Sequence, residues 1–139
     1  MPIIPEIPGE IYPDRESLRS IAQFFENVPT ASETRLQPDP HDPRMVRTQF
    51  ENRTDEQDSS VLQLTVQWFY NGDFSIHCFE IGSDQDWQCR WDRHNNLGYT
   101  RTHFHHPPDG DRITDLEINS THPIETVSII LAAIQSHKA

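Results

Sequence analysis

The residues of this chain best suited to chemistry lie between Tyr99 and His106. This segment contains Arg101 and three histidines, His103, His105 and His106. Histidine changes its charge near neutral pH, and an arginine can stabilise negative charge on a phosphate, so the two types together suit acid–base chemistry. Eight of the 139 residues are histidine, and four of the eight fall between positions 94 and 106, which marks this segment as the candidate site.

Alternation along a strand divides these side chains between two faces. In a strand over Tyr99–His106, one face carries Tyr99, Arg101, His103 and His105, and the other carries Thr100, Thr102, Phe104 and His106. Because Phe104 is apolar, we expect its face to point to the core and the first face to stay open. A regular strand therefore separates His106 from the other two histidines, and a site that uses all three needs a bulge or bend near Pro107.

One interpretation of the open face is metal-independent RNA cleavage. One histidine would take the proton of the ribose 2′-hydroxyl, another would protonate the leaving 5′-oxygen, and an arginine would stabilise the charge on phosphate. Asp92 would either orient a histidine or cap its turn. The predicted catalytic residues are Asp92, His94, Arg101, His103, His105 and His106, with Arg93 and Tyr99 as RNA contacts and no cofactor.

Three other interpretations stay open. His103 and His105 have a spacing that also suits a metal site, which His106 or Asp92 would complete. The same strand could instead meet a partner protein as a non-catalytic binding or assembly module. Finally, the histidines could simply occupy a solvated strand and have no function.

Charge is the strongest global feature of the chain. The formal net charge is −11, and Lys138 is the only lysine among eleven basic residues. This balance favours adaptation to molar salt, where charges are screened over about 3 Å, so the acidity does not exclude an RNA substrate.

No stretch approaches the roughly 20 apolar residues of a membrane helix, and the first residues do not resemble a signal peptide. We therefore expect a cytoplasmic protein without membrane contact, with self-association left open.

The elements that position the candidate site form an α+β pattern. We expect a five- to six-stranded antiparallel sheet with an N-terminal and a C-terminal helix on one face. Residues 1–13 would be a proline-rich arm and residues 14–139 a single domain. The first helix would run from an Asp14 cap to about Asn27, and the last from Ser120 or Thr121 through Pro123. The expected strands are 44–52, 61–70, 74–81, 86–92, 99–106 and a short 112–118, with a charged loop over 54–60.

Turn positions predict the register of the central strands. A two-residue turn at Ser83-Asp84 places Cys78 opposite Cys89 and His77 opposite Arg90. Reduced, buried thiols are the favoured interpretation of the cysteines in a cytosolic protein. At the preceding hairpin two signals conflict, because an Asn71-Gly72 turn pairs Phe74 with Phe69 whereas the apolar pattern pairs it with Tyr70.

The second half of the chain resembles a known family. The segments Cys89-Arg90-Trp91-Asp92-Arg93-His94-Asn95-Asn96 and Thr102-His103-Phe104-His105-His106-Pro107-Pro108-Asp109-Gly110, followed by a helix, are similar to the TumE family of toxin–antitoxin proteins. The matching positions are Asp92, His94, His105 and His106, over residues 86–137. Arg93 stands where asparagine is usual, and no proline follows Phe104. The resemblance implies a toxin acting on RNA or translation and a helix-turn-helix antitoxin as partner.

Overall fold

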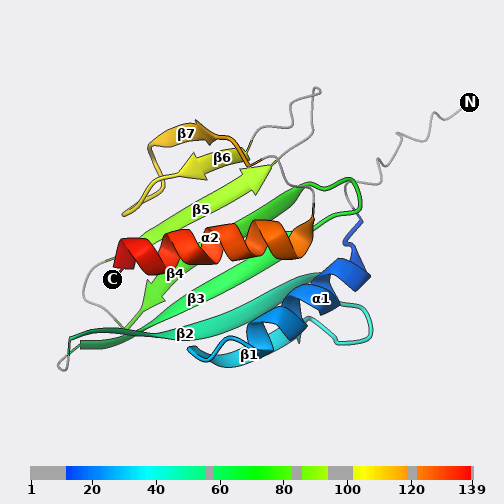
Figure 1. The fold of residues 1–139 in the computed structure, drawn as a ribbon, viewed down its shortest axis with the longest axis horizontal. Coiled ribbons are helices and arrows are strands. Elements are labelled where there is room, and N and C mark those ends of the chain that lie inside the picture. The colour runs from blue at the N-terminus through cyan, green and yellow to red at the C-terminus, as the bar shows by residue number, and fades with distance from the viewer. Residues whose placement is uncertain (1–11, 56–57, 83–85, 94–101, 119–121, 139) are drawn as a thin grey trace, which may run out of the picture.

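The computed structural model describes residues 12–55, 58–82, 86–93, 102–118 and 122–138, and this part of the chain forms two helices and one antiparallel sheet of seven strands in sequential order (Figure 1). The elements are α1 (Arg15–Glu26), β1 (Ala31–Gln37), β2 (Met45–Asp55), β3 (Asp58–Trp68), β4 (Phe74–Ile81), β5 (Gln88–Arg93), β6 (Thr102–His105), β7 (Ile113–Leu116) and α2 (Pro123–Lys138). The predicted α+β class with terminal helices is confirmed. The predicted number of strands, five or six, is wrong.

The additional strand is β1, at the edge of the sheet. Its sequence, Ala-Ser-Glu-Thr-Arg-Leu-Gln, lacks the alternation of apolar residues that predicts a strand, and none of its side chains is buried. It is held by antiparallel pairing with β2, in which Thr34 lies opposite Thr48 and their hydroxyl oxygens are 2.8 Å apart. Pairing also extends β2 and β3 through part of the segment predicted as a charged loop over 54–60. A polar hairpin needs only backbone hydrogen bonds, which hydropathy does not reveal.

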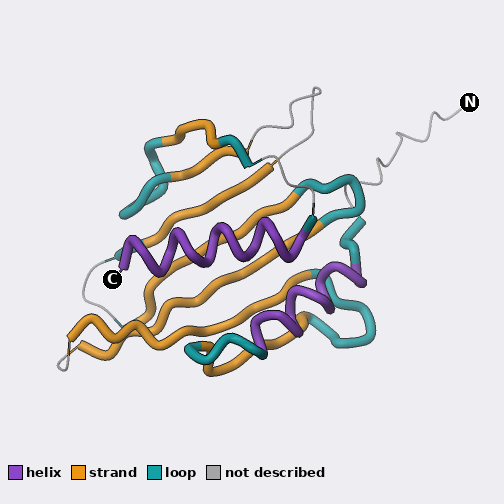
Figure 2. Tube along the Cα trace, in the orientation of Figure 1, coloured by secondary structure: helices purple, strands orange, loops and turns teal. Residues whose placement is uncertain are grey.

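Both helices cover the same face of the sheet, with α2 along the central strands and α1 beside β1 and β2 (Figures 1 and 2). Helix α1 begins where predicted, because the Asp14 side chain accepts a hydrogen bond from the backbone N–H of Ser17 at 3.1 Å. The core between the layers contains side chains from both helices and from alternate positions of the strands: Leu18, Ile21, Phe25, Val127, Ile130, Ile134, Val46, Leu64, Val66, Ile76, Cys78 and Trp91. Each large apolar side chain buried there contributes about 1.5–3 kcal/mol.

The register of the central strands follows the predicted alternation. Cys78 lies opposite Cys89, as predicted, and both are buried and free of a disulfide. Phe74, however, pairs with Trp68 rather than with Phe69 or Tyr70, and its ring stacks on the indole at 5.1 Å. The turn is longer than two residues because the aromatic pair fixes the register. Tyr70, which the apolar pattern paired with Phe74, lies beyond the end of β3 and is 61% exposed.

The face of the sheet that the helices leave uncovered is therefore lined by the other half of each strand. His77 and Arg90 lie opposite each other on this open face, as the predicted register required. Neither helix in the described part of the chain has the length and apolar character needed to cross a bilayer.

Candidate functional site

His105 on β6 forms the centre of a charged cluster on the open face. Its Nε2 lies 3.1 Å from Oδ2 of Asp92 on β5. Arg90 donates from Nε to the same Asp92 oxygen at 3.0 Å, and its terminal nitrogen lies 3.3 Å from His105 Nε2. The Asp92 side chain is only 5% exposed, so its charge is held by these partners away from bulk water. This arrangement fixes the orientation of the imidazole and leaves Nδ1 on the opposite side of the ring.

His103 forms a second pair of the same kind. Its Nδ1 lies 2.9 Å from Oδ1 of Asp115 on β7, and its side chain is 35% exposed. The carboxylate thus contacts Nδ1 in His103, whereas in His105 the carboxylate contacts Nε2. Nε2 of His103 therefore faces away from Asp115. Two imidazoles, each oriented by its own carboxylate, therefore stand on one strand.

Strand pairing explains why these five side chains meet. Asp92, His103 and Asp115 are successive cross-strand partners on β5, β6 and β7, and Arg90 lies opposite His105. The two histidines are two residues apart, so they share a face and their Cα atoms are roughly 7 Å apart. The sheet, and not a flexible loop, sets the geometry of the cluster.

His106 is absent from this cluster, because alternation turns it to the helix-covered face. Its ring packs against Phe104 at 4.4 Å, Nδ1 lies 2.9 Å from an Arg112 nitrogen, and Nε2 lies 2.8 Å from the Thr114 hydroxyl. Since a guanidinium can only donate, Nδ1 is the acceptor and the proton is on Nε2. Burial, together with the nearby Arg112 cation, lowers the pKa of His106 below its ordinary value, which favours this neutral form.

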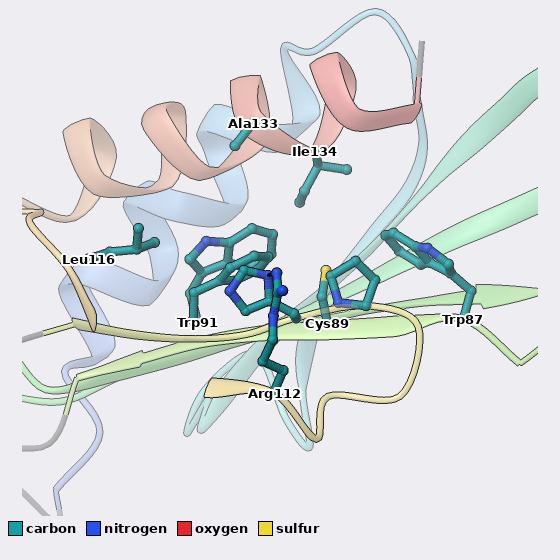
Figure 3. A pocket seen from close by; sticks show the side chains of 10 residues that line it. Trp87, Cys89, Trp91, Arg112, Leu116, Ala133 and Ile134 are labelled. Atoms are coloured by element: carbon teal, nitrogen blue, oxygen red, sulfur yellow. Dashed lines mark hydrogen bonds between the residues drawn. The ribbon is translucent and has the colours of Figure 1, made fainter. Parts of the chain in front are cut away.

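His106 lines a pocket of about 490 Å³ between α2 and strands β5 to β7 (Figure 3). The walls are mainly apolar and aromatic, and Arg112 is the only permanently charged side chain among the described residues that line them. The aromatic wall continues inward, where Trp91 stacks on Phe104 at 4.8 Å. His106 thus belongs to an apolar environment, unlike His105 beside it in the chain.

Arg93, predicted as an RNA contact, also points to the helix-covered side. It is 5% exposed, donates to the backbone oxygen of Ile118, and lies over the Phe74 ring at 5.0 Å. Burial lowers the pKa of Arg93, and the charge of Asp73 offsets part of that effect. The guanidinium stays protonated and ties the segment before α2 to the sheet.

The structure brings together three of the predicted catalytic residues, Asp92, His103 and His105. The other candidates His94, Tyr99 and Arg101 lie outside the described residues, so the predicted strand over 99–106 is described only from Thr102. Sequence reasoning missed Arg90 and Asp115 as members of the site. Arg90 could have been identified from the sequence, because the predicted register placed it on the strand next to β6. For Asp115 the sequence indicated only that it lies in a short predicted strand.

The cluster has the parts needed for proton transfer beside an anion. A carboxylate that holds one nitrogen of an imidazole fixes its tautomer and orientation, so that the other nitrogen can take or give a proton. Arg90 adds a permanent positive charge next to His105. Among the described residues, no group of three or more histidine, cysteine or acidic side chains is arranged to hold a metal ion.

Comparison with known proteins gives one match. A family model described as toxin TumE matches residues 19–138, which is most of the chain. This range extends well before residue 86, where the resemblance seen in the sequence began, and includes α1 and β1–β4. No curated protein and no solved structure matches the chain.

Proposed function

The chain belongs to the toxin TumE family, and we propose that this toxin is a ribonuclease that needs no metal and uses the two carboxylate–histidine pairs on β6. The observation that carries the proposal is their geometry. His105 is held by Asp92 at 3.1 Å and His103 by Asp115 at 2.9 Å, on the same open face. An acid and a base are the two groups that transesterification of RNA requires.

In the proposed reaction, neutral His105 accepts the proton of a ribose 2′-hydroxyl at Nδ1. The 2′-oxygen then bonds to phosphorus, and the bond from phosphorus to the 5′-oxygen breaks. Protonated His103 donates its Nε2 proton to that leaving oxygen. The products are a 2′,3′-cyclic phosphate and a 5′-hydroxyl, and one proton has moved from His103 to the product while His105 gained another.

The buried carboxylate of Asp92 stabilises the imidazolium that forms on His105, in the way that an aspartate supports a histidine base in other hydrolytic sites. Arg90 keeps donors beyond the Nε–H that it gives to Asp92, and these can stabilise charge on the phosphate oxygens. We include Arg101 as a second phosphate contact and Tyr99 as a base-stacking group, on their sequence positions alone. His94 stays a candidate on the same basis.

The family also implies an antitoxin partner, and we propose a small helix-turn-helix protein that acts with this toxin in the cytoplasm. A second, non-catalytic role is favoured by the edge strand β7, where Ile113 is 54% exposed. An exposed strand edge can pair with a strand of another protein. In that role β7 would bind the antitoxin.

The test is expression of the toxin alone and with its gene neighbour, followed by cleavage assays on purified protein at low and at molar salt. His105→Ala and His103→Ala should each reduce RNA cleavage by about 10²–10⁴-fold, because each removes a proton-transfer group. His41→Ala, an exposed histidine far along the chain from the cluster, is the matched control and should cleave normally.

Full toxicity and cleavage in the His103→Ala/His105→Ala double variant would overturn the assignment of the site. A stoichiometric transition metal in purified protein that is lost in His105→Ala would overturn the metal-free mechanism. Circular dichroism and the melting temperature of each variant show that a loss of cleavage is not a loss of fold.

A further inference from the structure

A row of side chains crosses the open face of the sheet perpendicular to its strands. It takes one residue from each strand, and neighbours in the row are cross-strand partners: Arg35, Arg47, Thr65, His77, Arg90, His105 and Ile113. Five of these seven are arginine or histidine. The row passes through the candidate site, because its members on β5 and β6 are Arg90 and His105.

The middle of this row lies in a hollow of about 410 Å³ on the open face. Arg47 and Arg90 stand at its two sides, with Thr65 and His77 between them. Adjacent strands are about 4.8 Å apart, so three steps separate the two arginine Cα atoms by roughly 14 Å. A stacked nucleic acid strand has one phosphate per roughly 3.4 Å of its axis, so the hollow can hold several nucleotides.

The charge of the hollow is opposite to that of the chain. The whole protein has 22 acidic residues and 11 basic ones, yet none of the described residues that line the hollow is acidic. On the same face, Glu33 is paired with Arg35 and Asp92 with Arg90. Arg47 instead has its Nε buried without a hydrogen-bond partner in the described part of the chain. A cation kept apart from carboxylates in so acidic a protein is suited to bind an anion.

The remaining lining suits bases more than a simple anion. The ring of Phe79 lies in the hollow and stacks on His77 at 5.2 Å. Gln63, Gln67 and Gln88 also line it. The Oε1 atoms of Gln63 and Gln88 already contact Gln49 and His77, so these two glutamines offer mainly their amide N–H donors, and Gln67 offers a donor and an acceptor. Proteins that bind single strands combine a positive groove with aromatic side chains on which bases stack. A duplex would hide its base faces from Phe79.

We propose that this hollow binds single-stranded RNA, which crosses the strands from Arg47 toward Arg90 and delivers its scissile phosphate to His105. The inference rests on the proposed ribonuclease function for the identity of the ligand. Arg47 would contact phosphate, Phe79 would stack on a base, and the glutamines would bind base edges. Arg90, shared by the hollow and the cluster, would mark the point where the bound strand enters the site.

The experiment measures binding separately from cleavage. The probe is a short fluorescein-labelled single-stranded RNA with 2′-O-methyl riboses, which cannot undergo the proposed cleavage. Arg47→Gln should weaken binding about 5-fold and lower the slope of log affinity against log salt by about 0.7, the value for one phosphate contact on a single strand. Phe79→Ala should weaken binding roughly 5-fold or more.

Arg19→Gln is the matched control, because Arg19 is an exposed arginine on α1, on the helix side of the sheet. Its affinity and salt slope should equal those of the wild type. Equal binding by Arg47→Gln, Phe79→Ala and wild type, or equal affinity for duplex DNA, would overturn the inference even if the wild type cleaves RNA. Binding with the expected variant effects but no cleavage of unmodified RNA would support the inference and overturn the proposed nuclease. The melting temperature verifies that each variant is folded.

Discussion

His105 and His106 are neighbours in the chain, and the structure puts them in two different kinds of surroundings. On the open face, His105 contacts a carboxylate and an arginine that leave one ring nitrogen for proton transfer. On the helix-covered face, His106 has Arg112 on Nδ1 and Thr114 on Nε2, beside the ring of Phe104. Both nitrogens of His106 are occupied and its pKa is lowered. The same side chain is therefore suited to chemistry on one face and to structure on the other.

The difference extends to the two faces as a whole. The helix-covered face buries apolar and aromatic side chains, whose removal from water is the main source of stability. The open face carries charges and amides, most of which remain partly hydrated and so contribute little to stability, with the buried Asp92 as an exception. Changes on the first face should thus lower the free energy of unfolding, and changes on the second should lower activity. Each of the following experiments tests whether the two faces differ in this way.

The largest effect on stability is expected at Trp91. Its side chain is 4% exposed and stacks on Phe104, so Trp91→Ala leaves a large cavity beneath α2. The free energy of unfolding should fall by about 3–5 kcal/mol, as measured by urea denaturation. His105→Ala should lower it by less, about 1–2 kcal/mol, because Arg90 still pairs with the buried Asp92. A His105→Ala variant as unstable as Trp91→Ala would show that the open face is part of the stable core.

A smaller effect, on the reaction itself, is expected at Asp92. Asp92→Asn keeps the shape of the side chain but removes the charge that orients and supports His105. The kcat for RNA cleavage should fall about 10–100-fold with little change in KM, because the carboxylate acts mainly on the transition state. The control is Asp42→Asn, an exposed aspartate paired with Arg15, which should leave kcat unchanged. Wild-type kcat in Asp92→Asn would remove Asp92 from the mechanism.

Strand alternation alone predicted the opposite placement of His105 and His106. The register of Cys78 with Cys89 was predicted from the position of the turn between their strands, and the observed pairing agrees with it. Alternation did not place Arg93 inward, because the strand was expected to end at Asp92 and its continuation by one residue turns Arg93 to the core. An error of one position at the end of a strand thus moved a charged residue between faces.

Two other features depend on contacts that no local pattern contains. Asp115 meets His103 only because β6 and β7 pair antiparallel across the turn after Pro107, and that register is set by the turn geometry. Strand β1 forms because β2 offers an edge for its backbone hydrogen bonds, although none of its own side chains is buried. Hydropathy predicted the helices and the buried strands of the sheet. The polar edge strands could not be predicted in this way, because they form through backbone pairing with a neighbouring strand.

The smallest expected effect is a pH dependence of stability at His106. Its pKa is lower in the folded chain than in the unfolded one, so the unfolded chain binds the proton first as the pH falls. The stability that comes from the neutral ring is complete above about pH 6.5, and it is lost as the pH falls toward the folded-state pKa. His106→Gln should remove part of this slope in the free energy of unfolding. Arg112→Gln should reduce it as well, since the nearby cation contributes to the shift.

The same variant addresses the comparison of the two histidines directly. Since the His106 ring lies on the helix-covered face, away from the Asp92–His105 pair, His106→Gln should cleave RNA within about 2-fold of the wild type while its stability depends less on pH. A folded His106→Gln with a cleavage rate as low as His105→Ala would mean that the reacting strand reaches the pocket under α2 as well. The leaving oxygen could then receive its proton from His106 as well as from His103. The assignment of chemistry to the open face and of structure to the helix-covered face would then be wrong for the adjacent residues His105 and His106.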